Sequence, residues 1–174
     1  MPFGGHSVDE RAVGPMKMNK FTLRLFVLLL VVTVNVMARD AKSLRGIHGL
    51  QVVVEELSSA VEQAGLHRTD IQTDVELKLR LAGIKVLPED DPSGSPYLYI
   101  NAHVILGQTM PTYAAVDCEL HQYVILARDE SIKTTAATWN TGSAGISSLE
   151  HVRDHIKDLV DIFINDYLSV NPKK

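Results

Sequence analysis

The chain of 174 residues is modestly acidic, and this balance limits the partners that its surface can attract. Its 17 lysines and arginines against 21 aspartates and glutamates give a formal net charge of −4 at pH 7. Because nucleic-acid binding depends on clustered basic residues that neutralise phosphates, the composition argues against a nucleic-acid partner. It argues equally against an anionic membrane surface. The one cysteine cannot form an internal disulfide.

An apolar run near the amino terminus predicts the compartment of the protein. The uncharged stretch 25–38 holds 14 residues, whereas a membrane-spanning helix needs about 20. A basic leader precedes the run, and Val36 and Ala38 suit the −3 and −1 positions of a cleavage site. We therefore expect residues 16–38 to be a signal peptide cleaved after Ala38. Cleavage would leave no stable membrane anchor and would release the protein into the periplasm or the medium.

The segments on either side of this signal set the expected domain organisation. Residues 1–15 combine glycine, proline and mixed charge without periodicity, and we expect them to be a non-native or disordered extension. Residues 39–174 then form a single αβ domain, which is long enough to bury a core without disulfides. This part carries 13 basic and 19 acidic residues, a net charge of −6.

The first half of the domain has the pattern of a βαβ unit. The β-branched run 49–57 predicts a strand. Residues 70–82 fit both a strand and a helix, but a capping box over 69–72 and the glycine at 83 favour the helix. The apolar segment 84–87 that follows predicts a second strand.

Three antiparallel strands and a final helix are expected in the second half. Alternating apolar residues predict strands at 97–107, 113–128 and 132–142. A capping box at Ser147 and an apolar stripe predict a helix over 148–168. The resulting order is β-α-β-β-β-β-α. The expected fold class is α+β: a two-layer sandwich with a mixed, mostly antiparallel five-stranded sheet and both helices on one face.

This order of elements resembles the small αβ domains of bacterial envelope proteins, such as the TolB amino-terminal domain and the curli-secretion lipoproteins. The resemblance is one of fold and carries no site residues. The segments "TDVELKLRLAGIKVL", "PYLYIN", "TAATWNTGSAG" and "FINDYLSVNP" also look like a group of uncharacterised exported bacterial proteins of similar length. That likeness implies an exported domain and transfers no activity.

The parity of the two long strands separates an apolar face from a polar one. Cys118 shares the apolar parity, so we expect a buried and inert thiol, and Trp139 is expected in the core as well. The opposite face holds Tyr97, Tyr99, Asn101, His103, Tyr113, Asp117, Glu119, His121 and Tyr123. A turn centred near Met110 would set Tyr97 opposite Tyr123. We therefore expect the four tyrosines of this face to lie close together and to be partly exposed.

The tyrosine-rich face admits two interpretations. Tyrosine suits the wet face of an antiparallel sheet, and it is also enriched in protein interfaces. The functional interpretation is a non-catalytic periplasmic module that binds an envelope protein or a second copy of itself, with no cofactor. Its expected binding residues are Tyr97, Tyr99, Asn101, Tyr113 and Tyr123.

A metal-dependent enzyme or metal-binding protein is the alternative on the same face. Zinc or copper accepts imidazole and carboxylate ligands, and the expected register sets His103 opposite Asp117. The candidate ligands are His103, Asp117, Glu119 and His121. A second pair, His151 and His155, is spaced four apart on the final helix. It lacks the glutamate that follows the first histidine in zinc proteases, and a solvated helix face is expected there.

Overall fold

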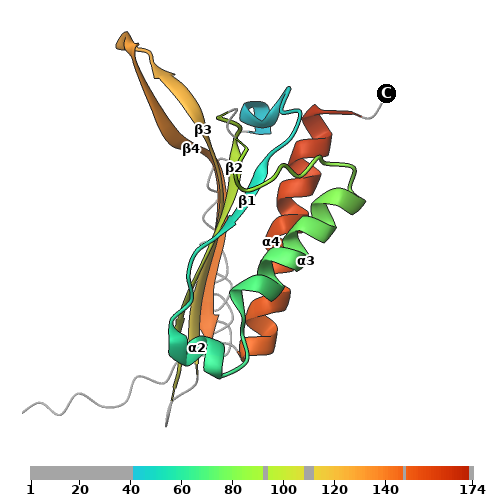
Figure 1. Cartoon of the computed structure of the whole chain (residues 1–174), viewed down its shortest axis with the longest axis vertical. Coiled ribbons are helices and arrows are strands. Elements are labelled where there is room, and N and C mark those ends of the chain that lie inside the picture. Colours follow the sequence, from blue (N-terminus) through green and yellow to red (C-terminus); the bar gives the residue numbers. More distant parts are fainter. Residues whose placement is uncertain (1–40, 92–93, 108–111, 147, 173–174) are drawn as a thin grey trace, which may run out of the picture. The chain divides into compact units, whose positions relative to one another are not determined.

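The computed structural model of the chain describes residues 41–172 apart from 92–93, 108–111 and 147 (Figure 1). All the described residues fall within one unit, Met37–Lys174. The expected extension at 1–15 and the expected signal peptide at 16–38 lie outside the described residues, and both stay predictions.

Four strands form one mixed sheet in the described part of the chain. They are β1 (Gln51–Val54), β2 (Tyr97–Ile105), β3 (Tyr113–Leu126) and β4 (Asp129–Ile146), and they lie in that spatial order. β1 pairs with β2 in parallel, and the other two pairs are antiparallel. The α+β class and the mostly antiparallel sheet are therefore confirmed.

Two long helices cover one face of this sheet, as the sequence predicts (Figure 1). They are α3 (Arg68–Leu81) and α4 (Leu149–Val170), which follow the short elements η1 (Ala41–Leu44) and α2 (Ser59–Gln63). Each long helix buries an apolar stripe at helical spacing: Ile71, Val75 and Leu79 from α3, and Val152, Ile156, Leu159, Val160 and Phe163 from α4.

The expected strand at 84–87 is wrong, so the sheet of the described residues has four strands rather than five. This segment makes only an isolated parallel bridge, between Val86 and Leu50. It lies beside β1, but Pro88 follows at once and has no N–H to continue a ladder. The side chain of Gln51 instead donates to the carbonyls of Pro88 and Glu89, at 2.8 and 2.9 Å. The short helix α2 was also not expected.

The expected capping boxes differ from the observed helix starts. α3 begins one residue before Thr69, with His67 at the N-cap and no side-chain cap hydrogen bond. The Gln72 side chain donates to Glu76 instead of reaching back to the cap. Ser147 lies outside the described residues, and the N-cap of α4 is Ser148, whose hydroxyl accepts from the His151 N–H. Both helices form nonetheless, because their buried stripes supply most of the stability.

The core lies between the helices and the inner face of the sheet. Alternate strand residues point into it: Val52, Val54, Leu98, Ile100, Val116, Cys118, Leu120 and Trp139, none more than 3% exposed. The expected burial of Cys118 and Trp139 is therefore confirmed. The Trp139 ring meets Phe163 edge to face at 5.1 Å, and its indole N–H donates to Asp166 at 2.9 Å.

The hairpin of β3 and β4 extends past the start of β2 (Figure 1). β2 pairs with β3 only as far as His121, so residues 122–126 of β3 pair with β4 alone. Two register irregularities, after Leu120 and after Ile125, accompany the bend of this arm. β4 runs from 129 to 146, longer than the expected 132–142.

Candidate functional site

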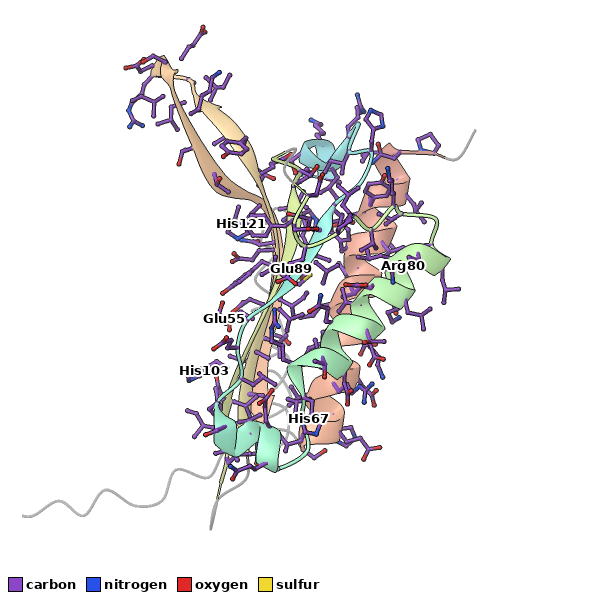
Figure 2. All side chains as sticks on the ribbon, in the orientation of Figure 1. Glu55, His67, Arg80, Glu89, His103 and His121 are labelled. Carbon is purple, nitrogen blue, oxygen red and sulfur yellow. The ribbon has the colours of Figure 1, made fainter. Side chains whose placement is uncertain are left out.

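The face of the sheet away from α3 and α4, here called the outer face, carries the residues that the sequence assigns to an interface. On β2 and β3 it presents the odd-numbered positions, which alternate with even-numbered ones that are buried over 98–102 and 114–120. Figure 2 shows His103, His121 and Glu55 on this side of the sheet. α3 and α4 cover the opposite face only, so nothing in these two helices shields the outer face from a partner.

The five expected interface residues all lie on the outer face, but not in one place. They are Tyr97, Tyr99 and Asn101, which are half-buried, and Tyr113 and Tyr123, which are 42% and 68% exposed. Tyr113 pairs with Ile105 at the far end of β2. At about 3.3 Å per residue, this row lies roughly 25 Å from Tyr97. The expectation that all four tyrosines lie close together is therefore wrong for Tyr113.

The register of β2 on β3 also differs by two residues from the expected one. Tyr97 pairs with His121 and not with Tyr123. A shift by an even number of residues leaves every side chain on its own face. The assignment of faces is therefore right although the cross-strand pairs are wrong.

An aromatic and acidic group of side chains, here called the outer-face cluster, occupies the start of β2. The Tyr97 ring stacks on His121 with centroids 5.0 Å apart, and Tyr99 meets the same imidazole edge-on at 5.7 Å. The imidazole Nε2 lies 2.7 Å from a Glu119 carboxylate oxygen. The Tyr99 hydroxyl donates to the Glu55 carboxylate beyond the end of β1. These contacts hold the rings in place before any partner arrives.

On the outer face, the pKa values of Tyr99 and Asp117 are both raised. The hydrogen bond to Glu55, followed by burial, raises the pKa of Tyr99 to about 12, so its phenol stays protonated. Burial first, and then the charge of Glu119, raises the pKa of Asp117 above its ordinary value. The Asp117 carboxylate lies over Gly142 of β4, where any Cβ would meet it. The face can therefore stack planar groups and accept hydrogen bonds from a partner.

A row of exposed apolar side chains lies at the other end of the outer face. Ile105, Tyr113 and Ile146 are paired in register across β2, β3 and β4. They are 56%, 42% and 74% exposed. Three large apolar residues side by side form a patch rather than a scatter of single exposed residues. We call this row the apolar row.

The candidate metal ligands are not brought together. Glu119 and His121 contact each other, but His103 pairs with Ala115 and not with Asp117. Within the described parts of the chain, no group of three or more histidine, cysteine, aspartate or glutamate side chains is arranged to hold a metal ion. The two-residue shift in register removes the pairing on which the metal hypothesis depended.

The structure adds a cavity that the sequence did not indicate, between α4, the start of β3 and the end of β4. Its volume is about 340 Å³, and His151 and His155 both border it, although both are exposed as expected. The Ser143 hydroxyl contacts His155 Nε2, and Ser148 Oγ lies 2.9 Å from His151 Nδ1. No carboxylate among the described residues is hydrogen-bonded to His155. A serine and histidine without an orienting acid do not make a nucleophilic triad.

No helix formed by the described residues is both long and apolar enough to span a membrane. The described residues form an α+β sandwich in which two long helices cover one face of a four-stranded sheet.

Comparison with known proteins adds little to this description. A scan against protein-family models gives no match, and a search of curated proteins gives none either. Among solved structures, the chain is similar to a minor lipoprotein from Acinetobacter baumannii. The TM-score is 0.32 and the identity 11%, over 72% of this chain and 93% of that one. A TM-score this low carries no argument about function.

Proposed function

We propose that this protein is a non-catalytic interaction module that binds a partner protein through the outer face. The observation that carries the proposal is the outer-face cluster, in which Tyr97, Tyr99 and His121 are fixed against one another on a face that α3 and α4 leave open. Rings held in place before binding lose little conformational entropy when a partner arrives. Tyrosine is among the residues that most often carry binding energy.

The chemistry of the outer face also defines the partner. Glu55 and Glu119 place carboxylates beside the rings, so a matching surface supplies cationic or hydrogen-bond-donating groups there. The apolar row at the other end requires an apolar counterpart. We propose that this partner is an envelope protein or a second copy of the chain, and that binding needs no cofactor.

Photocrosslinking in an expressing bacterium tests the proposal. A benzophenone amino acid replaces Tyr113 or Tyr123 on the outer face, and Leu77 or Leu81 on α3 serves as the matched control. Leu77 and Leu81 are 52% and 76% exposed, so the controls are also large apolar side chains open to solvent. We expect a discrete adduct from the outer-face positions and none from α3.

The mass of the adduct distinguishes the two kinds of partner. An adduct of twice the chain mass identifies a second copy, and any other discrete mass identifies a different envelope protein. Adducts of equal yield from both faces, or adducts from α3 alone, would show that the outer face is not the interface.

We further propose that the protein acts in the periplasm or outside the cell after removal of its signal peptide. The support is the apolar run 25–38 with its basic leader and its cleavage site at Ala38. Mass spectrometry of protein recovered from the periplasm should find Arg39 as the first residue. An intact amino terminus in the membrane fraction would contradict this.

A further inference from the structure

A second cavity, of about 580 Å³, lies where β1 and β2 begin. Its walls come from the connector 45–49 between η1 and β1, from Lys85 and Leu87, and from the end of the loop before β2. Gln122 of β3 borders it as well. The volume falls within the roughly 300–1,000 Å³ that is typical of small-molecule sites. We call it the basic cavity, after Arg45, His48 and Lys85 in its lining.

Hydrogen bonds to the neighbouring parts of the chain fix the walls of the basic cavity. Four of them are Gly46 N–H to Asn171 Oδ1 (2.8 Å), the Tyr167 hydroxyl to the Ile47 carbonyl (2.7 Å), Leu50 N–H to the Lys85 carbonyl (3.0 Å) and Leu87 N–H to the Leu50 carbonyl (2.9 Å). They tie the connector to the end of α4 and the segment 85–87 to the start of β1. The cavity is therefore preformed, which lowers the cost of binding.

The basic residues of this cavity differ from those on the helices in lacking ionic partners. Arg68, Lys78, Arg80, Arg153 and Lys157, on α3 and α4, all form ion pairs with carboxylates. Arg45, His48 and Lys85 are exposed, and no described residue forms an ion pair with any of them. Two cations and a histidine without ionic partners among the described residues, around one cavity of a domain that is acidic as a whole, indicate a site for an anion.

The acidic and apolar groups of the cavity narrow the kind of anion. Asp91 is the one acidic residue among the described residues of the lining, and its carboxylate accepts a hydrogen bond from the Ser95 hydroxyl at 2.9 Å. Arg45 and Lys85, with His48 beside them, therefore outnumber the single described acid of the lining, which suits an anion. Ile47, Leu87 and Pro96 supply apolar wall. A ligand that fits both parts carries its charge on an apolar body.

We propose that the basic cavity binds a phosphate ester with an apolar body, either as a free metabolite or as a lipid headgroup. The planar Arg45 guanidinium can form paired hydrogen bonds to phosphate oxygens, and the Lys85 ammonium adds a point charge. The proposal stands apart from the outer face and does not depend on a protein partner.

Chemical-shift titration of the isotope-labelled protein, as recovered from an expressing bacterium, tests the proposal. Phenyl phosphate and inorganic phosphate are the soluble probes, and vesicles with or without phosphatidylglycerol are the membrane probes. We expect saturable shifts at the amides of 45–49 and 85–87, and tighter binding of phenyl phosphate than of inorganic phosphate. Specific sedimentation with phosphatidylglycerol vesicles identifies a lipid headgroup as the source, and soluble binding alone identifies a free ester.

Two double variants that remove the same charge distinguish binding in the basic cavity from general electrostatic attraction. Arg45→Gln with Lys85→Gln should raise the dissociation constant for phenyl phosphate about tenfold or more. Arg128→Gln with Lys133→Gln removes the same charge from the exposed hairpin and should leave binding unchanged. If the double variant fails to fold, the single variants Arg45→Gln and Lys85→Gln are measured in its place. Absence of localised shifts with every probe, or equal weakening in the hairpin variant, would overturn the proposal.

Discussion

The two faces of the sheet are built from alternate residues of the same strands, yet different forces hold their side chains. On the inner face, Leu98 and Cys118 are completely buried, and neighbours fix them by volume alone. On the outer face, Tyr99 is held by one hydrogen bond to Glu55 and by an edge contact with His121. The inner face thus constrains size and apolarity, whereas we expect the outer face to tolerate changes of side-chain chemistry at a smaller cost to stability.

The largest effect on the free energy of unfolding is expected from Phe163 of α4, whose ring packs against the inner face. Its ring is fully buried and packs against Trp139 and Tyr167, with centroids 5.1 and 6.2 Å away. Phe163→Ala should therefore lower the free energy of unfolding by about 3–5 kcal/mol, measured by urea denaturation. Phe163→Leu is the control and should cost less than about 1.5 kcal/mol. A loss below 1 kcal/mol in the alanine variant would contradict the assignment of the core.

A smaller effect is expected from the outer-face cluster, through the hydroxyl of Tyr99. Tyr99→Phe removes the hydrogen bond to Glu55 and should cost about 1 kcal/mol of unfolding free energy. Tyr113→Phe is the matched control, because no described residue is hydrogen-bonded to the Tyr113 hydroxyl, and it should be neutral. Equal losses in the two variants would contradict the observed contact.

The pH dependence of that loss follows from the raised pKa of Tyr99. The fold holds this pKa at about 12 against an ordinary value of 10, so it favours the protonated phenol. The stabilisation is therefore complete below pH 10 and disappears as the pH rises to about 12. We expect the difference between wild type and Tyr99→Phe to be constant up to pH 9 and to shrink above pH 10. An increase above pH 10 would reverse the sign and exclude the contact with Glu55.

The inner face could be predicted from the sequence because the geometry of a strand alone determines which side chains point to it. A period of two residues sends every other side chain to the core, so Cys118 and Trp139 were placed correctly without knowledge of the turns. The same pattern wrongly predicted a strand for the segment 84–87. Its apolar pattern is that of a strand, but a ladder needs successive backbone partners, and Pro88 and the side chain of Gln51 end the pairing after one bridge.

The candidate site was less accessible to sequence reasoning, because it depends on register as well as on parity. Residue composition does not show where the turn between β2 and β3 is centred. A shift of two residues separated His103 from Asp117 and brought His121 against Tyr97. The basic cavity joins Arg45, Lys85 and the end of a loop, which are distant in sequence. Only the folded chain brings these residues to one place.

The smallest effect on stability is expected from Tyr123, the most exposed tyrosine of the outer face. It is 68% exposed on the hairpin, and its ring lies against the backbone of Gly94, close enough that an added Cβ there would be 3.2 Å from it. Tyr123→Ala should change the unfolding free energy by no more than about 0.5 kcal/mol, because little buried area is lost. Thermal and urea denaturation measure this change.

Partner binding is the matched measurement on the same variant. If Tyr123 contributes to an interface, its removal should weaken binding of the crosslinked partner by about 2 kcal/mol while the fold stays intact. Loss of stability beyond 1 kcal/mol would show instead that Tyr123 anchors the loop before β2 through Gly94. In that case the inner and outer faces would differ less than their exposure indicates, because both would be held by packing.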